Sequence, residues 1–415
     1  MDNKDYIVKV ITDFYLNSGD FNGFPVRNIL LEKSELKDIL ASLIREDKIS
    51  LTFEDIDVNP HVKNFPEGPS EKQIEKLQNS ELEHNCAYPS CSHLKKVVDP
   101  LDYQGKPFTL RLALGEAALS YESFDLSVLE DYRNDPRYYY SNTDIYGQIR
   151  VGDKHDGSAG MLRSDEIFLK TFGFSYDSDL NRAVAVFLIY LSRLSPEHQQ
   201  MWNAKIVKGD YQLHPDYYRT SILGRFQEGI SIFDAFISEL QCINEMCGLM
   251  GRSLLFKKSV KPRDFGFLIR PTLKEYYDFI HTLDKLLSEN INKEFFRKDV
   301  PFEQDKGRKD GKIVVRQKGT IQILDDWLKL VYRTNDRKSI EEIIDTFKEI
   351  RELRQHPAHV IDDNVFNQIC FKQQRELIIK AYKNIRLLRL IFADHPNVAG
   401  YEIPDHLQSG KIWDI

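Results

Sequence analysis

The stretch SIEEIIDTFKEIRELRQHPAHV, residues 339–360, predicts a helix that ends in a sharp corner. Ser339 and Glu342 have the S-x-x-E spacing of a capping box, in which the two side chains bond backbone N–H groups of the first helical turn. From Ile340 to Ile350, isoleucine and phenylalanine recur every three or four residues. This period gives the helix one apolar face, so we expect it to pack inside a helical bundle.

Two arginines continue this apolar face at the end of the helix, namely Arg351 and Arg354. Pro357 then stops the helix, and His356 and His359 flank it. Arginine rarely faces a core unless it forms an ion pair with a carboxylate or has a functional role. A neutral imidazole can take a proton from a ribose 2′-OH, and a guanidinium can stabilise charge on a phosphate. That chemistry needs no metal ion or other cofactor, so none is expected.

The surrounding sequence predicts a helical bundle over residues 272–396. Apolar residues follow a helical period in four segments, which are approximately 272–290, 319–333, 339–355 and 364–393.

The hexapeptide RQHPAH, residues 354–359, resembles the R-x4–6-H motif of the HEPN superfamily. Members of that family are small helical bundles, and many are metal-independent ribonucleases of toxin and phage-defence systems. The resemblance implies a bundle that dimerises, with Arg354 on the scissile phosphate and His359 as general acid and base. Arg351 and His356 form a nested second match, in which the acidic residue after the arginine fits the family less well.

The motif has two fixed residues, and the same spacing recurs elsewhere in the chain, for example from Arg193 to His198. Its position at a helix end is what singles out Arg354 and His359. A purely structural alternative stays open, in which Arg354 caps helix carbonyls and His359 bonds the adjoining turn.

A polar segment at 297–318 carries eight basic and four acidic residues, although the chain as a whole has a net charge of −7. It is either a solvated flexible loop or an electrostatic guide for a phosphate backbone. The candidate RNA-binding residues are Lys306, Arg308, Lys309, Lys312, Arg316 and Lys318.

The sequence of residues 1–65 predicts a winged-helix-like domain, because two segments with the apolar spacing of amphipathic helices precede a segment at 49–53 that alternates as a strand does. A duplex reader must neutralise several phosphates, whereas this segment holds twelve acidic and eight basic residues. We therefore expect a protein-contact or packing module, and DNA binding is the less favoured alternative.

The rest of the chain divides by composition. Residues 66–100 are rich in Pro, Ser, Glu and Lys and are predicted to be a linker or surface segment. Residues 101–271 are predicted to be a central region that is mainly helical and contains short strands. The helical part of this region is expected mainly at 167–256. Residues 397–415 are predicted to be a C-terminal tail. The predicted class is mainly α, and α+β overall.

Only one segment, residues 84–93, collects metal-ligand types, but its spacing is poor for zinc. The weak candidates are His84, Cys86, Cys91 and His93. Five cysteines in 415 residues fit a reducing compartment. The N-terminus lacks a secretory pattern and no apolar run approaches 18 residues, so we expect a cytoplasmic protein without a membrane span.

These observations favour a metal-independent endoribonuclease of a bacterial toxin or phage-defence type. RNA would be its substrate, a second copy would pair through the bundle, and the N-terminal and central regions would restrain or recruit it, with a regulatory protein as a further partner. The first alternative is a non-enzymatic scaffold or dimerisation protein. The second is a DNA-binding regulator acting through residues 1–65.

Overall fold

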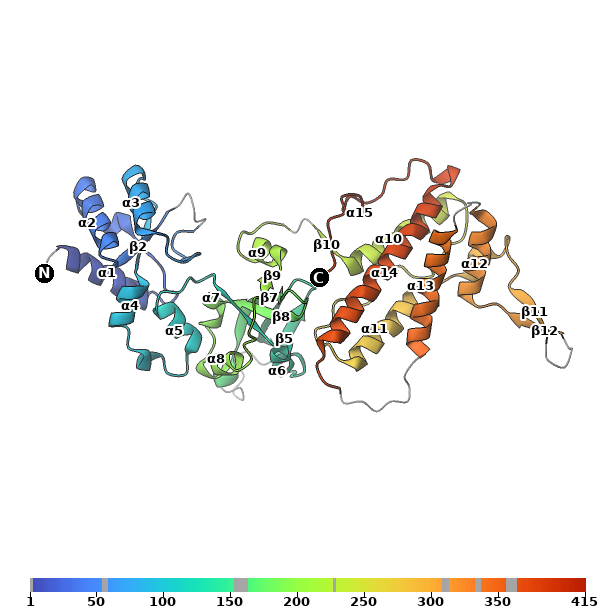
Figure 1. Cartoon of the computed structure of the whole chain (residues 1–415), viewed down its shortest axis with the longest axis horizontal. Helices are drawn as coiled ribbons and strands as arrows, with labels where there is room; N and C mark the ends of the chain where they lie inside the picture. Colours follow the sequence, from blue (N-terminus) through green and yellow to red (C-terminus); the bar gives the residue numbers. More distant parts are fainter. Residues whose placement is uncertain are drawn as a thin grey trace. The chain divides into compact units, whose positions relative to one another are not determined.

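A computed structural model describes residues 3–53, 59–152, 163–226, 229–307, 313–332, 337–355 and 364–415. The chain forms two compact units, Met1–Arg225 and Phe226–Ile415 (Figure 1). About half of the residues are helical and about 15% lie in strands, which confirms an α+β class. Within the described ranges, no helix has both the length and the apolar character that a bilayer crossing requires.

The first unit begins with helices that surround a three-stranded antiparallel sheet, whose strand order is β1-β3-β2. Its elements are α1 (Asn3–Asn17), β1 (Phe24–Pro25), α2 (Lys33–Arg45), β2 (Ile49–Thr52), α3 (Ser70–Asn79), β3 (Cys86–Pro89) and α4 (Cys91–Val97). One apolar core joins α1, α2, α3 and the sheet.

The central strand of this sheet, β3, lies in the segment that was predicted to be a linker. Residues 66–100 instead supply α3, β3 and α4, so the N-terminal subdomain extends well beyond residue 65. Many of the polar residues of this segment lie on the exposed side of α3. The buried side of this helix consists of Gln73, Ile74 and Leu77. All four residues of β3 are buried, so the strand lacks the alternation of exposed and buried residues that identifies a half-buried strand.

The second half of this unit is built on a six-stranded antiparallel sheet in the order β4-β8-β7-β6-β5, with β9 paired to β7. The strands are β4 (Tyr121–Phe124), β5 (Tyr138–Asn142), β6 (Tyr146–Val151), β7 (Phe168–Tyr176), β8 (Arg182–Phe187) and β9 (Gln212–Leu213). Short helices accompany them, namely α5 (Pro107–Ala113), α6 (Glu130–Arg133), α7 (Leu188–Leu191), α8 (Pro196–Asn203) and α9 (Pro215–Ser221).

The helical prediction for 167–187 is wrong, because β7 and β8 occupy this segment. All six residues of β8 are buried. A strand covered on both faces is an unbroken apolar run, which periodicity cannot distinguish from a buried helix.

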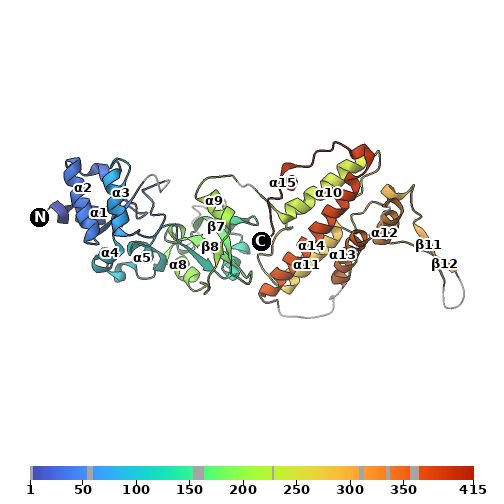
Figure 2. The ribbon, with the colours of Figure 1, turned by 45° about the horizontal axis from the view of Figure 1, so that its top comes forward.

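The second unit is a helical bundle. Its elements are β10 (Ile230–Ser231), α10 (Ile232–Leu249), α11 (Leu273–Leu286), β11 (Glu303–Gly307), β12 (Ile313–Gln317), α12 (Thr320–Val331), α13 (Lys338–Gln355), α14 (Gln368–Ala393), α15 (Asp405–Gln408) and β13 (Ile412–Trp413). Figure 1 and Figure 2 both show α10, α11, α13 and α14 running side by side. The four helices predicted over 272–396 correspond to α11, α12, α13 and α14.

The bundle is larger than predicted. Helix α10, which was assigned to the central region, packs along α14. The C-terminal tail also belongs to this unit, because β13 pairs with β10 and Arg375 of α14 binds Asp414 at 2.8 Å. The segment predicted to be a polar loop contains the antiparallel hairpin of β11 and β12.

Candidate functional site

Arg351 and Arg354 lie on the last turn of α13 and share one carboxylate, that of Asp284 on α11. Arg351 donates from Nε to Asp284 Oδ1 at 3.1 Å, and from Nη2 to Ser288 Oγ at 2.6 Å. Arg354 donates from Nη1 to Asp284 Oδ2 at 2.6 Å and also binds Glu289. The Asp284 side chain has no exposed surface, and Ser288 also donates to it.

The packing of α13 explains this arrangement. Its apolar face, which includes Ile343, Phe347 and Ile350, is buried in the bundle. Arg351 and Arg354 follow on the same face one turn later, so their side chains are directed toward α11. Both arginine side chains keep part of their surface in solvent, 33% for Arg351 and 26% for Arg354.

The site is close to neutral, because two guanidinium groups face the carboxylates of Asp284 and Glu289. The hydrogen bonds that Arg354 donates to Glu289 and Asp284 raise the pKa of Arg354, so this residue is a permanent cation. The hydrogen bond from Arg354 in turn lowers the pKa of Glu289 below its usual range. The pair of arginines is therefore held in place by charge as well as by packing.

We expect the Glu289–Arg354 ion pair to make a small, pH-dependent contribution to stability. Since the pKa of Glu289 is lower in the folded state, this contribution is present above the unfolded pKa and is lost as the pH falls through the folded pKa. The Glu289 side chain is 40% exposed, so screening limits the contribution to about 0.5 kcal/mol. Urea titrations at several acidic pH values should show a weaker pH dependence for Glu289→Gln, and equal dependence in both proteins would contradict the assignment.

Both histidines of the predicted site, His356 and His359, lie outside the described residues, as do 356–363 as a whole. The structure therefore brings Arg351 and Arg354 together at the helix end that leads into this segment. The relation of either histidine to the arginines stays a prediction.

Two of the predicted RNA-binding residues, Lys306 and Arg316, lie in the strands of the β11–β12 hairpin. In its antiparallel register, Lys306 is opposite Val314 and Gln304 is opposite Arg316. Opposed residues point to the same face and alternate residues share a face, so Lys306 and Arg316 lie on one side of the hairpin. Both are exposed.

Other members of the set behave differently. Lys318 binds Asp326 of α12 at 2.8 Å and has only 11% of its side chain exposed, so it anchors the hairpin to the bundle. Arg308, Lys309 and Lys312 lie outside the described residues.

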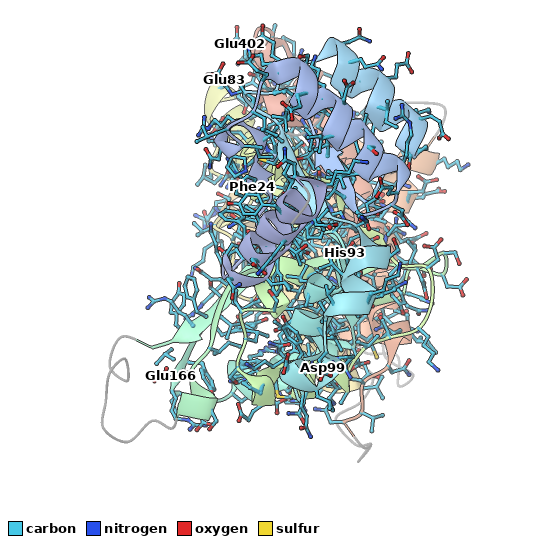
Figure 3. The ribbon with its side chains drawn as sticks, turned by 90° about the vertical axis from the view of Figure 1, so that its left-hand side faces the viewer. Phe24, Glu83, His93, Asp99, Glu166 and Glu402 are labelled. Carbon is cyan, nitrogen blue, oxygen red and sulfur yellow. The ribbon has the colours of Figure 1, made fainter. Side chains whose placement is uncertain are left out.

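The weak zinc candidates have different neighbours. Cys86 Sγ lies 3.5 Å from His61 Nδ1, and Cys91 Sγ lies 3.3 Å from Glu67 Oε1. His93, on α4 in Figure 3, lies 3.2 Å from Thr12 Oγ1. His84 is exposed. Among the described residues, no three His, Cys, Asp or Glu side chains are grouped as a metal site requires.

Sequence reasoning missed the acidic half of the site, which Asp284 and Glu289 provide. A signal was present, because Asp284 follows Leu283 and precedes Leu286 and Leu287 on a helix whose apolar face is buried. A carboxylate inside such a face implies a buried cationic partner. The identity of that partner depends on the tertiary fold.

The chain was also compared with known protein families, with curated proteins and with solved structures, and none of the three comparisons gives a match.

Proposed function

We propose that the chain is a metal-independent endoribonuclease whose site is the end of α13 and the segment that follows it. The observation that carries this proposal is the pair of partly exposed arginine side chains, Arg351 and Arg354, whose guanidinium groups bind the buried carboxylate of Asp284. Fixed cations at a defined position suit a phosphate whose charge increases during cleavage. The resemblance of residues 354–359 to the HEPN motif supports the same function.

In this mechanism the ribose 2′-oxygen attacks the adjacent phosphorus as His359 takes its proton. The bond from phosphorus to the 5′-oxygen breaks, and the leaving oxygen receives a proton from His359, which has become an imidazolium by taking the 2′-OH proton. Arg354 binds the phosphate and stabilises the charge on its oxygens. The phosphate replaces Glu289 as a partner of Arg354, while Asp284 keeps the guanidinium oriented.

The basic face of the hairpin supports RNA as the substrate. Lys306 and Arg316 share this face, and both side chains are in solvent. They would attract the phosphate backbone by long-range electrostatics, which predicts RNA binding that weakens with rising salt. The first unit would restrain the ribonuclease or recruit a regulatory protein.

The deciding experiment is an RNA degradation assay in EDTA with the full chain and with His359→Ala. We expect the full chain to cleave RNA in the absence of free metal and the variant to lose this activity. Equal cleavage by both proteins would assign the activity to a contaminant, and no cleavage by either on a panel of structured and unstructured RNAs would overturn the proposal.

A non-enzymatic scaffold is the second candidate, and the near-neutral cluster favours it. Asp284 and Glu289 already satisfy Arg354 within the bundle. If the cluster is only structural, Arg354→Ala should lower the melting temperature and leave RNA binding unchanged. If Arg354 binds phosphate, the same variant should also weaken RNA binding.

A further inference from the structure

The hairpin of β11 and β12 leaves both of its outer strand edges without a paired strand among the described residues. The two strands form a sheet of their own, so β12 pairs with β11 and with no other strand of the described chain. All five residues of β12 are exposed, including Ile313 at 70% and Val315 at 58%. In Figure 1 and Figure 2 the hairpin extends away from the helices of its unit, beyond α12.

The two edges of this hairpin differ in chemistry. Strand β12 is the β-branched sequence Ile-Val-Val followed by Arg316 and Gln317, with a single charge. Strand β11 carries Glu303, Asp305 and Lys306. Proteins protect open edges with charges or proline, and a two-stranded hairpin without further cover is only marginally stable. The β12 edge lacks this protection and the β11 edge has it.

We propose that two copies of the chain pair along β12, antiparallel about a two-fold axis at Val315, to form a four-stranded sheet. In this register Val315 faces Val315 of the second copy, Val314 faces Arg316, and Ile313 faces Gln317. No like charges oppose each other, and β-branched residues stack at the centre. The corresponding arrangement along β11, with its axis at Asp305, would oppose two carboxylates.

The four-stranded sheet has two distinct faces, because the register of each hairpin is known. Lys306 and Arg316 of both copies lie on one face, and Ile313 and Val315 of both copies form an apolar stripe on the other. This pairing is a property of the hairpin edge. It requires no RNA and is separate from contacts between bundle helices.

The test is sedimentation equilibrium of the full chain without RNA, from about 1 to about 300 μM. We expect a monomer–dimer equilibrium for the natural chain. Val315→Lys and Val315→Glu each place like charges on the axis and should weaken self-association about tenfold or more. An equimolar mixture of these two variants should recover dimers, because the opposite charges then face each other.

Val260→Lys is the matched control, since Val260 is also an exposed valine of the same unit, at 76% exposure, but lies outside the hairpin. It should dimerise like the natural chain, and at the low end of this concentration range the urea midpoints of Val260→Lys and Val315→Lys should agree, because both valines are exposed. The midpoint of Val315→Glu is compared separately, because this substitution places a carboxylate opposite Asp305 within the hairpin. A natural chain that stays monomeric over this range, Val315→Lys dimers of unchanged affinity, or a mixture that fails to associate would each overturn the proposal. RNA cleavage is assayed separately, so its outcome is independent of this one.

Discussion

Replacing Glu239 with leucine is expected to lower the free energy of unfolding of the bundle by about 3–5 kcal/mol. Glu239 on α10 accepts a hydrogen bond from Arg389 on α14, and both side chains are almost completely buried. Without the carboxylate, the Arg389 guanidinium would remain as an uncompensated charge in the interface. Urea unfolding at neutral pH, followed by circular dichroism, measures the loss.

The matched test is the double variant Glu239→Leu with Arg389→Met, which removes both charges together. Because apolar side chains of similar size avoid the cost of burying ions, this protein should regain most of the lost stability. A double variant no more stable than Glu239→Leu would show that the defect comes from packing, and an unaffected single variant would show that the pair is solvated in solution.

This ion pair also shows what the sequence could not reveal. The helical period of 339–355 identified α13 almost to the residue, although the structure starts the helix at Lys338, just before the predicted cap. The same kind of signal found α10, but an amphipathic pattern does not say which helix will cover it. The assignment of α10 to the central region followed from chain order, whereas Glu239 and Arg389, 150 residues apart, join it to α14.

The candidate site was predictable to the same extent. Arg351 and Arg354 were found because arginine at the end of an apolar face is unusual. Their partner Asp284 is 70 residues from Arg354, and no local pattern links the two. Strand β8 was missed for another reason, since a fully buried strand has lost the alternation that would have identified it.

Asp284→Asn should reduce RNA cleavage by about 100-fold if the proposed function is right. The substitution keeps the shape of the side chain but removes the charge that both arginines share. Arg354 would then be oriented by Glu289 alone, and a phosphate would find a guanidinium that is no longer fixed. Stability should also fall, by about 2 kcal/mol, because hydrogen bonds to a charged group are lost.

The two losses can be separated with Asp278→Asn, a control on the same helix. The Asp278 side chain is 69% exposed and pairs with Lys274, so this variant should cleave RNA normally and lose less than about 0.5 kcal/mol. Cleavage is compared below the unfolding transition, with kcat and KM measured separately. A positioning role predicts a lower kcat for Asp284→Asn at an unchanged folded fraction. Normal kcat in a destabilised protein would instead show that Asp284 and the two arginines only hold α11 and α13 together.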